Sequence, residues 1–137
     1  MVNNFSTIAY AKKIDKPWGY ELILSSSDSP ITSKILHLNS GARFSLQYHD
    51  QKEEVLTLVK GEAIIYLEDE NGTLQELPME LEKGYFVKAM QKHRCKGITD
   101  CDILESSTPE TGTTYRLEDD YNRPDETEEL RKSQRTP

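Results

Sequence analysis

The chain has 137 residues, which supports one compact domain, because two domains would each be too small to bury a stable core. Lysine and arginine total 17 against 24 acidic residues, and the net charge of -7 argues against nucleic acid or an anionic membrane as a partner. Residues 1–11 are polar with scattered apolar side chains and lack the apolar stretch of a secretory signal, so we expect a cytoplasmic protein.

Apolar residues recur in short runs with a period near two, and no long stretch shows the 3.6-residue period of a helix. This pattern predicts an all-β protein. We expect strands at residues 20–24, 31–38, 43–48, 55–59, 62–68, 74–77, 85–89 and 101–105. Many short strands at this spacing are typical of a sandwich or a barrel.

Turn residues separate the predicted strands. Gly41 and Gly61 each stand between two of them, where glycine supplies backbone angles that other residues avoid. Asn71-Gly72 predicts a hairpin closed by a type I′ turn, because both residues tolerate a positive φ. The two cysteines, Cys95 and Cys101, have neither zinc-ribbon nor Cys-x-x-Cys spacing, and we expect both to be reduced.

Beyond Ser106 the composition turns to polar residues and proline, with too few apolar side chains for a second core. We therefore divide the chain into an N-terminal extension at residues 1–15, one domain at residues 16–123 and a C-terminal tail at residues 124–137. The tail is expected to be a short helix or disordered.

The predicted strand around residues 43–48 carries the first sign of a functional site. Alternate side chains of a strand share a face, so one face would be polar and the other apolar. The polar row comprises Arg43, Ser45, Gln47 and His49, and the apolar row comprises Phe44, Leu46 and Tyr48. A polar row that faces the interior of a small barrel indicates an internal ligand or metal site.

Two further residues complete a candidate metal-binding set with Gln47 and His49. Glu54 opens the next strand, five residues after His49, and His93 comes from a distant strand. Two imidazoles, a carboxylate and an amide oxygen suit zinc or another first-row divalent ion, with positions left open for a ligand. As alternatives, His49 could be a core histidine and Gln47 a hydrogen-bonded interior amide.

The spacing of these residues resembles the cupin superfamily. Gly41 is followed by five residues, Gln47-Tyr48-His49, four residues, Glu54, six residues and Gly61, which is similar to the first cupin motif with Gln47 in place of its first histidine. His93 matches the last histidine of the second motif. The resemblance implies a single-domain cupin, a double-stranded β-helix or jelly-roll barrel, and by analogy a homodimer.

Three segments are similar to the isomerase domain of type II, bifunctional phosphomannose isomerases. They are the string from Gly41 to His49, Lys16-Pro17-Trp18-Gly19, and the segment from Arg116 to Arg123, which resembles the closing signature of that family. Lys52 stands where the family has arginine, and the turn before His93 also differs. Arginine and lysine hold a phosphate differently, so these departures bear on substrate identity.

The resemblance implies a metal-dependent isomerase that interconverts mannose 6-phosphate and fructose 6-phosphate. The metal would polarise the sugar's carbonyl while a base, which the sequence does not identify, moves a proton between carbons. Lys34, Arg43 and Arg123 are the candidates for binding substrate oxygens or phosphate, or else are surface charges and structural ion pairs. A non-catalytic sugar-phosphate or nucleotide-sugar binding cupin and another small-molecule cupin enzyme are the alternative functions.

Overall fold

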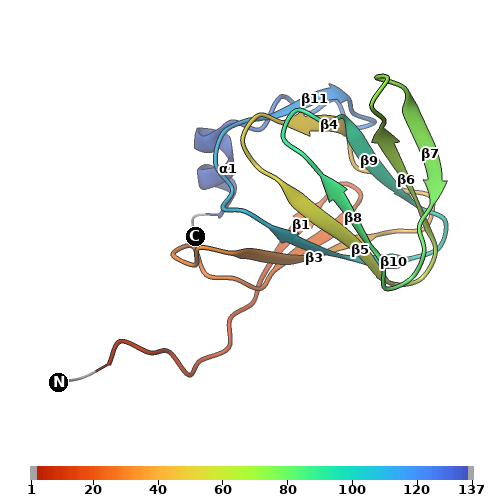
Figure 1. The fold of residues 1–137 in the computed structure, drawn as a ribbon. Helices are drawn as coiled ribbons and strands as arrows, with labels where there is room; N and C mark the ends of the chain where they lie inside the picture. Colours follow the sequence, from red (N-terminus) through yellow and green to blue (C-terminus); the bar gives the residue numbers. More distant parts are fainter. Residues whose placement is uncertain (1–2, 136–137) are drawn as a thin grey trace.

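The computed structural model describes residues 3–135 and is built almost entirely from strands in two antiparallel sheets that face each other (Figure 1). The first sheet has the order β1-β2-β3-β10-β5-β8 and the second the order β11-β4-β9-β6-β7. The strands of the first sheet are β1 (Lys12–Lys16), β2 (Gly19–Ile23), β3 (Thr32–Leu38), β10 (Cys101–Ser107), β5 (Glu54–Lys60) and β8 (Gly84–Val87). Those of the second are β11 (Thr114–Glu118), β4 (Leu46–His49), β9 (His93–Gly97), β6 (Ala63–Glu68) and β7 (Leu74–Pro78).

Every strand expected from the sequence is present, with ends that shift by at most three residues. Three further strands, β1, β9 and β11, lie outside the ranges predicted from the sequence. Their sequences, KKIDK, HRCKG and TYRLE, are rich in charged residues, so the apolar alternation that reveals the other strands is missing. The first sheet thus begins at Lys12, four residues before the boundary expected for the domain.

The core lies between the sheets. Leu38, Leu56 and Ile103 of the first sheet and Ile65 of the second are each fully buried, as expected for side chains on the facing surfaces of paired sheets. Each such side chain contributes about 1.5–3 kcal/mol on leaving water. Cys95 and Cys101 are buried as free thiols.

The hairpin between β6 and β7 forms where expected, but its turn differs from the predicted type I′. Asn71 does not adopt a positive φ, whereas Gly72 does, at 79°. The amide of Gly72 donates to the carbonyl of Asp69, and the Asp69 side chain accepts from the amides of Asn71 and Thr73. The Asp69 carboxylate thus stabilises a three-residue loop with glycine in the left-handed position, which competes successfully with the two-residue turn.

A short helix, α1 (Glu128–Arg135), packs beside β11 near the C-terminus (Figure 1). Thr127 accepts from the amide of Leu130, which caps the first turn. Arg131 is buried and donates to Glu126 and to the carbonyls of Glu110 and Gly112, so it fastens the helix to the loop between β10 and β11. The described part of the tail is therefore ordered.

None of the helices formed by residues 3–135 has the length and apolar character needed to cross a membrane.

Candidate metal centre

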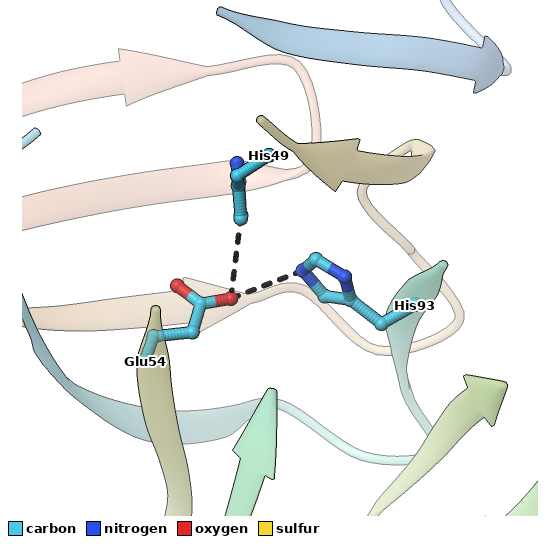
Figure 2. Close-up of side chains that lie close together, drawn as sticks. All are labelled: His49, Glu54 and His93. Atoms are coloured by element: carbon cyan, nitrogen blue, oxygen red, sulfur yellow. Dashed lines mark ion pairs between the residues drawn. The ribbon is translucent and has the colours of Figure 1, made fainter. Parts of the chain in front are cut away.

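Three side chains meet between the two sheets, each from a different strand (Figure 2). His49 ends β4, Glu54 begins β5 and His93 begins β9. One ligand atom from each residue lies within 4.8 Å of the others, and all three residues are buried. The antiparallel pairing of β4 with β9 sets Gln47 opposite His93, and this register brings the two distant parts of the sequence together.

The atoms that meet have unmet bonding capacity. Nε2 of His93 lies 3.0 Å from Oε1 of Glu54, and Nε2 of His49 lies 3.5 Å from the same oxygen. Among the described residues neither nitrogen makes a hydrogen bond of acceptable geometry, and the other oxygen of Glu54 faces the Lys52 ammonium at 3.3 Å. Buried polar atoms without partners are costly, so this donor set fits a cation that would bind all three.

The opposite nitrogen of each imidazole is held by the protein. Nδ1 of His49 lies 2.8 Å from the Thr114 hydroxyl, and Nδ1 of His93 lies 2.9 Å from the Gln91 carbonyl. A carbonyl can only accept, so Nδ1 of His93 donates this hydrogen bond, and Nε2 is the nitrogen that faces the centre. Such contacts fix the ring orientation and are typical of metal-binding histidines.

The protonation states also suit a metal. Burial, together with the nearby Lys52 ammonium, lowers the pKa of His49 to about 4, so its ring is neutral at pH 7. Burial would raise the pKa of Glu54, but Lys52 and the two imidazoles hold it well below its usual range. A neutral imidazole and an ionised carboxylate are the forms that coordinate a cation.

Gln47 lines the same pocket as His49 and Glu54. Its Oε1 accepts a hydrogen bond of 2.7 Å from the Ser45 hydroxyl, which leaves a second lone pair for another partner. The expectation that Phe44 points away from the interior is wrong. Phe44 is buried against Trp18 and contacts the His93 ring edge-on, because residues before Leu46 are not in regular strand and do not alternate.

A buried charge cluster adjoins the three residues; we use this name for Glu21, Lys34, Lys52, Glu105, Glu110 and Arg135. Lys52 is its link to the centre, since its Nζ lies 3.3 Å from Glu54, 3.3 Å from Glu105 and 3.4 Å from Glu110. Burial raises the pKa of Glu105 to about 7 against the opposing effect of Lys52. The sequence marked Lys52 only as a departure from the arginine of the similar isomerases, and it gave no sign of Glu105. Charged residues are rarely expected in the interior of a protein.

The three candidates for binding substrate lie in different places. Lys34 lines the pocket, but it is paired with Glu21 at 2.9 Å and with Glu110. Arg123 also lines the pocket and pairs with Asp119 at 2.8 Å. Arg43 is not among the pocket residues, because it precedes the regular part of β4 and reaches the exposed Asp120 at 2.8 Å.

Comparisons with known proteins agree with this arrangement. The family model described as mannose-6-phosphate isomerase C-terminal matches residues 3–126. Similar solved structures include an oxalate decarboxylase of Lactobacillus farciminis, with a TM-score of 0.70, 16% identity and coverage of 85% of this chain and 38% of that one. An oxalate decarboxylase of Bacillus subtilis, described for its Mn(II) centres, has a TM-score of 0.69, 12% identity and coverage of 85% and 34%.

KdgF from Halomonas sp. has a TM-score of 0.60 and 16% identity, and the match covers 72% of this chain and 87% of that one. The chain spans about a third of the length of the oxalate decarboxylases that it matches. No curated protein matches the sequence. At these identities the structures show the fold alone, and it is the single-domain cupin fold that was expected.

Proposed function

Because the chain belongs to the mannose-6-phosphate isomerase C-terminal family, we propose that it is a metal-dependent isomerase that interconverts mannose 6-phosphate and fructose 6-phosphate. The observation that carries the proposal is the convergence of His49, Glu54 and His93, in which two imidazole nitrogens without a hydrogen-bond partner among the described residues face one carboxylate oxygen. Aldose–ketose isomerisation needs a group that polarises a carbonyl and a group that moves a proton. The pocket beside the three residues offers candidates for both.

His49, Glu54, His93 and Gln47 would hold the metal, and we propose zinc because two imidazoles, a carboxylate and an amide oxygen are ligands that it accepts. Bound there, the ion would act as a Lewis acid on the sugar's oxygen atoms. Lys52 holds one oxygen of Glu54 at 3.3 Å while the other oxygen faces both imidazoles. The carboxylate is thereby oriented so that one oxygen is available to the ion.

Glu105 is the residue that we propose as general base. Its carboxylate lines the pocket, accepts from the Ser107 hydroxyl at 3.0 Å and lies 3.3 Å from Lys52. A pKa of about 7, raised by burial, suits a group that must take a proton from one carbon and return it to the next at neutral pH. Glu105→Gln should therefore lower kcat by about a hundredfold or more while leaving metal binding intact.

The proposal is tested by adding mannose 6-phosphate to zinc-loaded protein and following fructose 6-phosphate. Glu54→Gln should abolish metal binding and turnover together, because it removes a charged ligand from the centre of the set. Glu62→Gln changes an exposed carboxylate between strands and is the matched control that should keep both. Metal-loaded wild-type protein that forms no fructose 6-phosphate would refute the assigned reaction.

A second candidate function is sugar-phosphate or nucleotide-sugar binding without catalysis. It is favoured by the buried charge cluster, in which Lys34 and Lys52 are already neutralised by glutamates. Saturable binding of a sugar phosphate with no conversion would support it. Another small-molecule cupin reaction is the third candidate, and a redox-active ion in the purified protein would favour it over zinc.

We also propose that the chain forms a homodimer. Residues 3–11 form an arm that leaves the edge of the first sheet (Figure 1), and Phe5 and Ile8 are 82% and 85% exposed although residues 8–10 line a shallow pocket with the segment between β2 and β3. The backbone of this arm makes no hydrogen bond with the described body of the chain, and it continues directly into β1 at the edge of the first sheet. A segment that extends an edge strand and exposes apolar side chains can add to a second copy. Native mass measurement should give twice the chain mass, and removal of residues 1–11 should give a monomer; a wild-type monomer would refute dimerisation.

A further inference from the structure

The cations around the pocket differ in how well the protein satisfies them. Lys34 and Lys52 each contact two or more carboxylates of the pocket. Lys16, Arg116 and Arg123 also line the pocket, but much of their capacity to donate hydrogen bonds is unused among the described residues. We call these three residues the basic end. Such a difference indicates that the basic end has an acceptor from outside the chain.

Arg116 provides the clearest sign. Its side chain is only 6% exposed, and it donates to the Pro124 carbonyl at 2.7 Å and to Glu126 at a long 3.5 Å. Its Nε is buried without any partner among the described residues. Burial, with the neighbouring Arg123, lowers the pKa of Arg116, so its charge is incompletely balanced. A buried guanidinium that is left partly unsatisfied is costly unless a ligand completes it.

Lys16 and Arg123 have spare donors beside it. The Lys16 side chain is 8% exposed, and within residues 3–135 it makes no hydrogen bond and its one ion pair is with Glu21, at 4.0 Å. Burial lowers the pKa of this ammonium, which again indicates weak compensation. Arg123 is bound to Asp119 through Nε and one terminal nitrogen, so its other terminal nitrogen is available. Three cations with open donors suit an anion that has several oxygens.

The strand register places Arg116 relative to the metal-binding residues. On β11, Thr114 lies opposite His49 and Arg116 lies opposite Gln47. Residues two apart share a face of a strand, so Arg116 lies on the site-facing side of β11, about 7 Å along the strand from Thr114. From the level of His49 to that of Arg116 the strand thus runs about as far as an open-chain hexose 6-phosphate, in which five carbon–carbon bonds separate the carbonyl end from the carbon that carries the phosphate.

Building on the function proposed above, we propose that Lys16, Arg116 and Arg123 bind the phosphate ester of the substrate and make the pocket select phosphorylated sugars over free sugars. Arg116 and Lys16 were not expected from the sequence to bind substrate. Lys34 instead holds Glu21 and Glu110 in place, and Arg43 lies outside the pocket.

Calorimetric titration of zinc-loaded protein with mannose 6-phosphate and with mannose tests this assignment. Arg116→Gln should weaken mannose 6-phosphate binding by about ten- to a hundredfold, the value of a charge-assisted hydrogen bond, and leave mannose binding unchanged. Lys16→Gln should act in the same direction. Arg94→Gln is the matched control, because Arg94 also has a buried terminal nitrogen with no partner in the described part of the chain but is not among the pocket residues.

A wild-type affinity for mannose 6-phosphate in Arg116→Gln would overturn the assignment, as would equal weakening of phosphorylated and free sugar. The isomerase activity is judged separately, since turnover with an unchanged KM in Arg116→Gln would leave the enzyme proposal standing and remove only the phosphate site. If neither sugar binds, inorganic phosphate is titrated into the His93→Ala variant without metal. Binding that is lost on adding Arg116→Gln supports the basic end, and binding that is absent or independent of Arg116 refutes it.

Discussion

Replacement of Lys52 by methionine should strongly destabilise the protein, because Lys52 neutralises three buried carboxylates. Its Nζ lies 3.3–3.4 Å from Glu54, Glu105 and Glu110, and its side chain is 9% exposed. Methionine keeps a similar shape, so packing changes little while the charge is lost. Removing one partner of a buried ion pair costs about 3–5 kcal/mol, and this is the loss expected in the free energy of unfolding.

Most of that cost should fall on Glu54, because Lys52 is the main group that holds the pKa of this carboxyl well below its usual range. Glu110 retains Lys34 and Arg135 as partners, and Glu105, with a pKa of about 7, can take up a proton at neutral pH. Glu54→Gln should therefore be less destabilising in the Lys52→Met background than in the wild type, by about 1–3 kcal/mol. Urea unfolding of the four metal-free proteins at pH 7 gives the cycle. Additive effects, or a cost of Lys52→Met below about 1 kcal/mol, would refute the assigned role of the lysine.

Two further predictions concern stability. The pKa of His49 is about 4 in the folded chain, lowered by burial and by Lys52, against about 6.5 in the unfolded chain. The unfolded state therefore takes up the proton first as the pH falls, and metal-free protein should lose about 3 kcal/mol of stability between pH 7 and pH 4; a loss that is undiminished in His49→Gln would contradict this. Gly61→Ala should destabilise more than Gly41→Ala in thermal melts, although both have a positive φ, because a Cβ at Gly61 would lie 2.3 Å from the Asp100 carbonyl oxygen while Gly41 has open space. Equal losses of stability in the two variants would show that the positive φ alone sets the cost and that the close contact at Gly61 adds nothing.

The sequence predicts the scaffold well where apolar alternation is intact. Strands such as β3 and β10, each with one face in the core, repeat apolar residues at a period of two and are visible without any structure. The strands that line the pocket are less visible. On β11, Thr114 and Arg116 face the site, so the inward row that normally reveals a strand is polar.

The grouping of His49, Glu54 and His93 was also predictable from the sequence, because the spacing from Gly41 through His49 and Glu54 to Gly61 resembles a known motif. The charged residues around this cluster could not be predicted from the sequence. Lys52, Glu105 and Arg116 are buried charged residues, and local sequence assigns such residues to the surface. Their burial depends on pairing across strands that are far apart in the chain, and only the register reveals that pairing.

Metal binding at His49, Glu54 and His93 is the most direct test of the whole account. Purified protein would be stripped with a chelator, dialysed against zinc and assayed for bound metal by mass spectrometry, alongside Glu54→Gln and the exposed Glu62→Gln control. We expect one zinc ion per chain in the wild type and in Glu62→Gln, and none in Glu54→Gln. Equal metal content in all three proteins, or no metal in the wild type, would contradict the account.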